Sequence, residues 1–133
     1  MHSNHRRGAV SEYTAAAAFS QQGWEIFWPP SGSGAADFVA VRDDESCRVQ
    51  VKTARWMEKA RSRFLRATIK TPTRTYKSGD FDYLAVVAPD GRVWVIPFDE
   101  LPDTTLIYLE RHRNGEVHHY ERDKWIVTQT SNS

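Results

Sequence analysis

Cysteine and long apolar runs are both scarce in this sequence, and each scarcity excludes a class of protein. A single cysteine, Cys47, among 133 residues excludes an internal disulfide and is typical of a reducing compartment. Its place in a run of strand-forming residues predicts a buried structural thiol. No apolar run approaches the ~18 residues of a membrane span, and residues 1–7 lack the apolar segment of a signal peptide. We therefore expect a cytoplasmic protein with no membrane partner.

Acidic residues are almost missing from residues 55–77, although the whole chain carries a net charge of only +1. This stretch holds eight basic residues against a single acid, Glu58, whereas residues 1–54 sum to −1 and residues 78–133 to −5. Clustered positive charge of this kind is typical of a surface that contacts phosphates. The basic residues of the stretch are Arg55, Lys59, Arg61, Arg63, Arg66, Lys70, Arg74 and Lys77.

Length and composition predict one globular domain. A chain of 133 residues with 40% hydrophobic residues and five tryptophans can bury a core without disulfides. We expect a single domain over residues 1–133, with flexible ends at residues 1–7 and 129–133.

The order of hydrophobic patterns predicts an α/β (α+β) domain with a central mixed β-sheet flanked by helices. The pattern of residues 8–22 is helical, and Gly23 ends it. Residues 54–63 have the composition of a bend or loop, and residues 71–79 form a polar connector. The expected strands cover residues 24–28, 63–70, 83–87, 92–96 and 105–109, with a helical turn at 98–101.

Two runs of β-branched residues, 37–42 and 47–53, predict a β-hairpin around the polar turn 43–46. Val49 and Val51 alternate with Gln50 and Lys52 along the second strand, so the two polar side chains share one face.

A four-residue turn would pair Arg42 with Cys47 and place Asp37 opposite Lys52, with Gln50 diagonal to it. Neighbours of this kind lie about 5 to 8 Å apart. A carboxylate, an amide and an ammonium group would then gather on one face. Since such groups are costly to bury unpaired, the pattern favours a site over a core.

This set matches the needs of metal-dependent phosphodiester hydrolysis. Mg²⁺ prefers a few protein oxygens and keeps several waters. Asp37 would supply the anionic ligand, Gln50 a side-chain carbonyl and Val51 its backbone carbonyl, while Glu12 would reach in from the helix. Such a metal activates water and polarises the phosphate. Lys52 would orient the water or stabilise the charge of the transition state.

Asp37, Gln50 and Lys52 in the spacing Asp-(x)12-Gln-x-Lys, with a helical Glu12 upstream, resemble the motif of the PD-(D/E)XK nucleases. The resemblance to their group I intron-encoded homing endonuclease branch runs from about residue 8 to 109. It is carried by GAVSEYTAAAAFSQQGWEIFWPP, ADFVAV, RVQVKTAR and YKSGDFDYLAVVAPDGRVWVIPFDEL. Gln at the second acidic position is usual in that branch. Ala36 departs from the proline of the superfamily name.

The resemblance implies a restriction-endonuclease-like core and cleavage of double-stranded DNA in a prokaryotic or phage-infected cell. It carries Glu12, Asp37, Gln50 and Lys52 over as the catalytic set, with Mg²⁺ as cofactor and Mn²⁺ as its substitute. It also implies a homodimer or homotetramer. The basic residues of 55–77 would then contact DNA, and Arg61 and Arg63 would follow one strand into the major groove.

Two other functions remain open from the sequence. The archaeal-type Holliday junction resolvases share the helical Glu, a loop similar to SGSGAAD and an E-x-K strand, and they cut branched DNA. A catalytically inactive DNA-binding module is the second alternative, since Gln50 replaces a carboxylate and so weakens metal binding. The histidines His112, His118 and His119 do not form a spacing that fixes a zinc site.

Overall fold

The computed structural model describes residues 3–30, 34–70 and 76–127. A long helix is followed by nine strands and two short 3₁₀ helices within these ranges. They are α1 (Ser3–Gln21), β1 (Glu25–Phe27), β2 (Phe38–Arg42), β3 (Glu45–Thr53), β4 (Arg55–Lys59), β5 (Ser62–Thr68), β6 (Tyr83–Val87), β7 (Val93–Pro97), η1 (Phe98–Glu100), β8 (Leu106–Arg113), β9 (Glu116–His118) and η2 (Asp123–Trp125).

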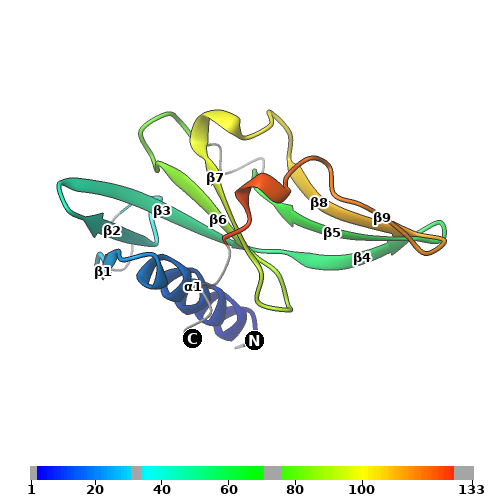
Figure 1. Ribbon diagram of the computed structural model, residues 1–133, viewed down its shortest axis with the longest axis horizontal. Coiled ribbons are helices and arrows are strands. Elements are labelled where there is room, and N and C mark those ends of the chain that lie inside the picture. The colour runs from blue at the N-terminus through cyan, green and yellow to red at the C-terminus, as the bar shows by residue number, and fades with distance from the viewer. Residues whose placement is uncertain (1–2, 31–33, 71–75, 128–133) are drawn as a thin grey trace.

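The strands form two sheets that share one continuous stretch of chain. The first sheet has the order β1-β2-β3-β6-β7, and only its β3–β6 pair is parallel. The second has the order β4-β5-β8-β9 and is antiparallel. Because Ala54 alone separates β3 from β4, the chain passes directly from one sheet into the other (Figure 1). The predicted mixed central sheet is confirmed.

Two hydrophobic cores explain this arrangement. The alanines and Phe19 of α1 pack on one face of the first sheet, against Phe38, Val49 and Val51. The opposite face of β6 and β7 packs against Leu65, Ala67 and residues of β8. The first sheet therefore lies between a helix and a second sheet. The prediction of flanking helices is only half right, since α1 is the single α-helix in the described ranges.

The second sheet shows that the prediction of a loop over residues 54–63 was wrong. Arg55–Lys59 forms strand β4 and pairs with β5, whereas the predicted strand 63–70 is largely β5. Positive φ angles at Ala60 (48°) and Arg61 (68°) close the hairpin with a two-residue turn. Asn-Gly is the usual sequence of such a turn, so the sequence Ala-Arg did not predict it.

The β2–β3 hairpin is real, but its register differs from the predicted one by two residues. Arg42 pairs with Glu45, and Cys47 pairs with Ala40 instead of Arg42. The turn contains two residues instead of four, because Asp43 adopts a φ of 55°, which Asp tolerates better than most residues. A shift of two residues keeps every side chain on its predicted face, since the side-chain period of a strand is two.

Some elements end where the sequence placed them, whereas β8 runs from Leu106 to Arg113, four residues past the predicted end at 109. The helix ends near Gly23, whose φ is 92°, but it begins at Ser3, so part of the predicted flexible segment 1–7 is helical. The predicted helical turn after Pro97 is η1. Near the end of the described chain, Val127 N donates to Val93 O and fastens that segment to β7. No helix of the described ranges is long and apolar enough to cross a membrane.

Candidate active site

Asp37 lies at the point where the β2–β3 ladder ends. Its backbone N donates to Val49 O at 2.8 Å, and its carboxylate Oδ2 accepts from Val51 N at 2.7 Å. The carboxylate thus continues the ladder in the place of a backbone carbonyl. Since the N–H and C=O of a strand residue point to the same side, the Val51 carbonyl faces the side on which Asp37 lies. Extending the observed register by one residue sets Asp37 opposite Gln50, whereas Lys52 was predicted there.

Gln50 and Lys52 lie on the face opposite Val49 and Val51, as their alternation predicted, and this face points away from α1. The two valines belong to the core beneath the helix. The Gln50 side chain is buried, with 6% of the residue exposed, and its Nε2 donates to Val51 O at 3.4 Å. The amide therefore lies over the backbone carbonyl that the sequence proposed as a second oxygen ligand.

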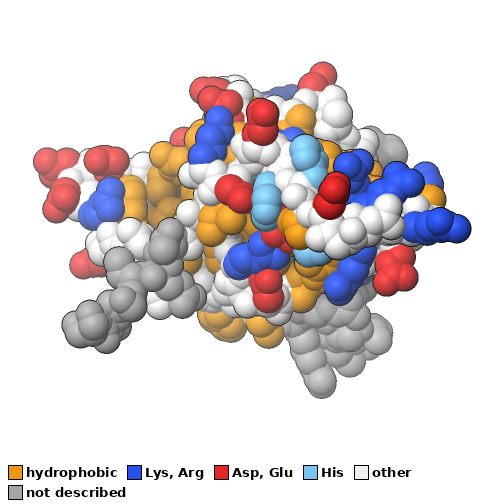
Figure 2. Space-filling view, turned by 45° about the vertical axis from the view of Figure 1, so that its right-hand side comes forward, with side chains coloured by type: hydrophobic (Ala, Val, Ile, Leu, Met, Phe, Trp, Pro, Cys, Tyr) orange, Lys and Arg blue, Asp and Glu red, His pale blue; other side chains and the backbone are white. Residues whose placement is uncertain are grey.

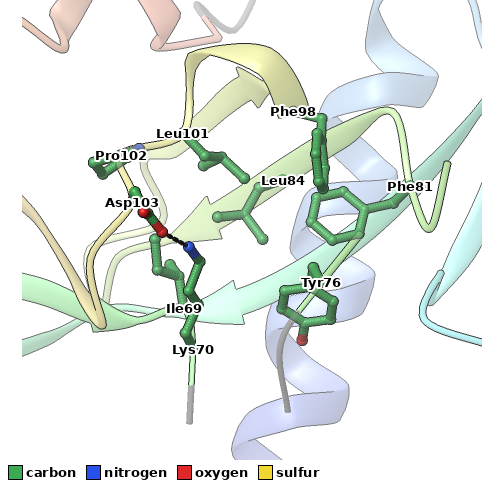
Figure 3. A pocket seen from close by; sticks show the side chains of 9 residues that line it. All are labelled: Ile69, Lys70, Tyr76, Phe81, Leu84, Phe98, Leu101, Pro102 and Asp103. Carbon is green, nitrogen blue, oxygen red and sulfur yellow. Dashed lines mark hydrogen bonds and ion pairs between the residues drawn. The ribbon is translucent and has the colours of Figure 1, made fainter. Parts of the chain in front are cut away.

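The Lys52 ammonium lies over an aromatic ring. Its Nζ is 5.5 Å from the centre of the Tyr76 ring, within the range of a cation–π contact. Tyr76 in turn packs edge-on against Phe81 at 4.9 Å, and its hydroxyl is buried without a hydrogen-bond partner in the described part of the chain. Figure 3 shows Tyr76 and Phe81 at one wall of a cavity of about 160 Å³, with the Lys70–Asp103 ion pair at the other. Sequence reasoning missed Tyr76.

Helix α1 brings Glu12 within electrostatic reach of Asp37. Partial burial raises the pKa of Glu12, and the negative charge of Asp37 raises it further. The helix is held there by a neighbouring contact, since Ser11 is buried and its Oγ lies 2.6 Å from Oγ1 of Thr53, the last residue of β3. No sequence signal pointed to Ser11.

These groups form a set of oxygens suited to a hard cation. Two carboxylates, Glu12 and Asp37, lie close enough to repel each other, and the Val51 carbonyl and the Gln50 amide lie beside Asp37. A divalent cation would relieve that repulsion, so the residues fit such an ion. No group of three or more His, Cys, Asp or Glu side chains that could hold a metal occurs in the described ranges. The oxygens gathered around Asp37 include two neutral ones, those of the Gln50 amide and the Val51 carbonyl.

The predicted basic surface is divided over several places. Arg55, Lys59, Arg61, Arg63 and Arg66 lie on the β4–β5 hairpin, and Figure 2 shows basic side chains gathered at the end of the molecule that the second sheet forms. Lys70 is engaged in its ion pair with Asp103, and Lys77 begins the segment leading to β6. Arg74 lies outside the described residues.

Arg61 and Arg63 do not follow one strand as predicted. Arg61 lies in the turn with a positive φ, whereas Arg63 lies in β5 opposite Glu58. The Arg63 guanidinium stacks 4.3 Å from the centre of the Trp56 ring, and Trp56 in turn meets His112 edge-on at 5.1 Å. Trp56, which the sequence left unassigned, thus fixes the orientation of an exposed arginine.

A partly buried ion pair that the sequence did not reveal joins the two sheets. Glu110 of β8 is 4% exposed and accepts hydrogen bonds from Nη1 and Nη2 of Arg92, the latter at 3.1 Å. The hydrogen bond from Arg92 lowers the pKa of Glu110. His112 Nε2 lies 3.3 Å and His119 Nδ1 3.5 Å from the same carboxylate. Its role is to anchor the second sheet to the turn before β7.

Cys47, Asp80 and Asp82 have structural roles. Cys47 is buried on β3, and burial raises the pKa of its thiol to about 11, so it is no nucleophile. Asp82 accepts from Arg48 N, and Asp80 accepts from Lys77 N, so both carboxylates fasten local backbone.

Comparison with known proteins bears on the family and the fold of this chain. The model of the PD-(D/E)XK endonuclease family matches residues 2–127. Protein 5.3 of Escherichia phage T7 is 31% identical over 116 residues, which cover 86% of this chain and 98% of that protein. The solved structure of a bacterial homing endonuclease, I-Ssp6803I, superposes with a TM-score of 0.76 at 18% identity, covering 95% of this chain and 88% of that one.

The likeness to I-Ssp6803I confirms the predicted fold class, a restriction-endonuclease-like core. The family match covers both sheets, α1 and every residue of the predicted catalytic set. The prediction of an endonuclease is thereby confirmed, and the chain belongs to the PD-(D/E)XK endonuclease family.

Proposed function

We propose that this chain is a divalent-metal-dependent endonuclease of the homing type that hydrolyses phosphodiester bonds in double-stranded DNA. One observation carries the proposal. The Asp37 carboxylate is fixed on β3 beside the Val51 carbonyl, and α1 holds Glu12 within electrostatic reach of that carboxylate. The fold shared with a bacterial homing endonuclease supports the homing type.

The residues of the site divide into metal ligands and one positively charged side chain, that of Lys52. Asp37, Glu12, the Gln50 amide and the Val51 carbonyl would hold Mg²⁺, with Mn²⁺ as a substitute. When bound, the metal polarises a phosphoryl oxygen and lowers the pKa of a water. Lys52 would donate from Nζ to a phosphate oxygen or to the attacking water, where its charge offsets the charge that develops on the phosphate.

Two features of the structure suit Lys52 to this task. The Tyr76 ring lies under the ammonium and restricts where it points, without removing its charge as an ion pair would. Lys52 is also only partly buried, as a residue that contacts a phosphate from solvent must be.

Gln50 has to turn its amide for the proposed ligation. In the structure Nε2 faces the Val51 carbonyl, whereas a metal requires the Oε1 atom. Rotation about the last side-chain bond exchanges the two atoms without moving the rest of the residue.

The test is cleavage of plasmid and linear duplex with Mg²⁺ or with chelator, by the wild type and by Asp37→Ala and Lys52→Ala. We expect cutting only with metal and its loss by at least about a hundredfold in each variant, with unchanged far-ultraviolet circular dichroism. Cutting in chelator, or a normal rate in either variant, would contradict the proposal. A four-way junction digested in parallel separates the homing type from a junction resolvase, and no cutting of any DNA form would favour an inactive binding module.

A further inference from the structure

A hollow of about 390 Å³ lies where the chain passes from β3 into the second sheet, and two arginines are among the residues that line it. Its walls are formed by Thr53, Arg55, Met57, Arg66, Ala67 and Thr68. Arg55 of β4 and Arg66 of β5 are direct cross-strand partners. Like charges placed directly opposite each other destabilise a strand pair.

No carboxylate of the described residues forms an ion pair with either arginine. The same hairpin pairs Glu58 with Arg63, so opposite charges face each other elsewhere in the same two strands. A cross-strand pair of arginines without a carboxylate partner is therefore a local feature of this hollow, and an anion bound between the guanidinium groups would offset their like charges.

The hollow is also built to hold its cations in place. Arg66 Nη1 donates to the Tyr108 hydroxyl at 3.4 Å, and its guanidinium lies 6.0 Å from the centre of the Tyr108 ring. Thr53 and Thr68 add hydroxyl groups to the walls. Guanidinium and hydroxyl donors together suit a tetrahedral oxyanion and carry no means of telling one base from another.

The position of the hollow relates it to the candidate active site. Thr53 directly follows Lys52, and the same Thr53 hydroxyl contacts Ser11, the neighbour of Glu12. The hollow therefore begins one residue beyond Lys52 along the chain, beside the contact that holds α1 against β3.

We propose that Arg55 and Arg66 together bind one backbone phosphate of the DNA, next to the bond that is cut. This inference rests on the proposed function, because it takes DNA as the substrate. The contact is independent of base sequence, and it fixes the register of the strand over Lys52.

The test is the affinity for a short duplex in chelator, measured over a range of salt concentrations. The proteins compared are the wild type, Arg55→Gln, Arg66→Gln and the double variant. Arg113→Gln is the matched control, since Arg113 is an exposed arginine of the same sheet that lies opposite Ser62 at the other end of β5.

We expect each single variant to weaken binding by about tenfold at low salt but to change the slope of log Kd against log salt by less than one, because the other arginine still neutralises the phosphate. The double variant should reduce that slope by about one, because both arginines share one phosphate. Arg113→Gln should leave both quantities unchanged. Additive losses with a slope change of two, or wild-type affinity in the double variant, would overturn the shared site.

A second measurement does not depend on DNA. Arg55→Gln should raise the melting temperature at low salt, because it removes the cross-strand repulsion, and Arg113→Gln should not. A melting temperature below that of the wild type would overturn the account of the pair as mutually repelling. If the wild type cuts DNA with Mg²⁺ and the double variant binds DNA normally, only the proposed phosphate site in the hollow is refuted. If the wild type neither binds nor cuts DNA, the proposed function is refuted as well.

Discussion

At the scale of single residues, Gln50 distinguishes this site from one that uses a second carboxylate on β3. Its buried amide lies beside the Val51 carbonyl, within the oxygen set that Asp37 and Glu12 complete. A neutral ligand leaves the site with less negative charge, so affinity for a divalent ion should be modest and open to improvement.

We predict that Gln50→Glu keeps cleavage and tightens metal binding by about tenfold, because it adds a charge to a ligand of the same shape. The measurement is the Mg²⁺ concentration that gives half-maximal cutting. Gln50→Leu, which keeps the volume and removes the oxygen, is the control and should need far more metal. Loss of all cutting in Gln50→Glu would show that the amide has a separate task.

Glu12 makes a prediction about pH. Its pKa is raised above the ordinary value of 4.5 by burial and by Asp37, so the folded chain holds this proton more tightly than the unfolded chain does. Stability therefore falls as pH rises through the range between the two pKa values, in the absence of metal.

Glu12→Gln should accordingly melt at the same temperature as the wild type or higher at pH 7 in chelator, and the gain should vanish below pH 4.5. Thermal denaturation followed at both pH values measures it. Added Mg²⁺ should stabilise the wild type and not the variant. A variant clearly less stable than the wild type at pH 7 would mean that the two carboxylates do not repel each other.

At the scale of elements, the connection from β3 to β4 places the site between two sheets with different roles. The first sheet, with α1, holds the acidic residues, and the second carries the arginines of the hairpin. The partly buried pair of Glu110 and Arg92 fixes the second sheet to the turn before β7. We infer that this pair sets the angle at which the arginines approach the DNA.

We predict that Glu110→Gln destabilises the fold by about 2 kcal/mol, because it weakens the charge-assisted hydrogen bonds from the partly exposed Arg92 to this buried side chain. The low pKa of Glu110 means that this contribution is present above pH 4.5 and is lost as pH falls further, so the difference should shrink in acid. Urea denaturation at pH 7 and pH 4 measures it. Asp90→Asn removes the exposed partner of Arg92 and should lower the free energy of unfolding by under about 1 kcal/mol. An equal loss of stability in both variants would contradict the conclusion that the burial of Glu110 makes its contact the stronger one.

At the scale of the whole molecule, one small domain carries one candidate site. Cutting both strands of a duplex requires two such sites, so we expect a homodimer or homotetramer. Several large apolar side chains on α1 and around the end of β1 are about half exposed or more, among them Tyr13 and Trp28, whose rings pack at 5.6 Å.

We predict a solution mass that is a multiple of 15.3 kDa by light scattering, and plasmid linearised without build-up of nicked circles. Dilution below the assembly's dissociation constant should favour nicking over linearisation, because single copies then act alone. A mass of 15.3 kDa at every concentration, together with linearisation in one step, would contradict the inferred assembly.

The sequence alone determined which residues could serve the chemistry. Alternation along β3 put Gln50 and Lys52 on one face, and that conclusion survived a register error of two residues because the side-chain period is also two. Helix α1, the strands at residues 83–87 and 92–96 and the turn after Pro97 were predictable because each has a strong local pattern. The resemblance of the motif then gave the family.

Only the tertiary structure decided how these residues meet. The turn at Asp43 depends on one backbone angle, and β4 exists because β5 is available to pair with it, which no local pattern of residues 54–63 encodes. The positions of Tyr76 under Lys52 and of Arg66 opposite Arg55 follow from contacts between segments far apart in the chain. Packing between distant segments fixes such contacts, and a pattern read along one segment cannot contain them.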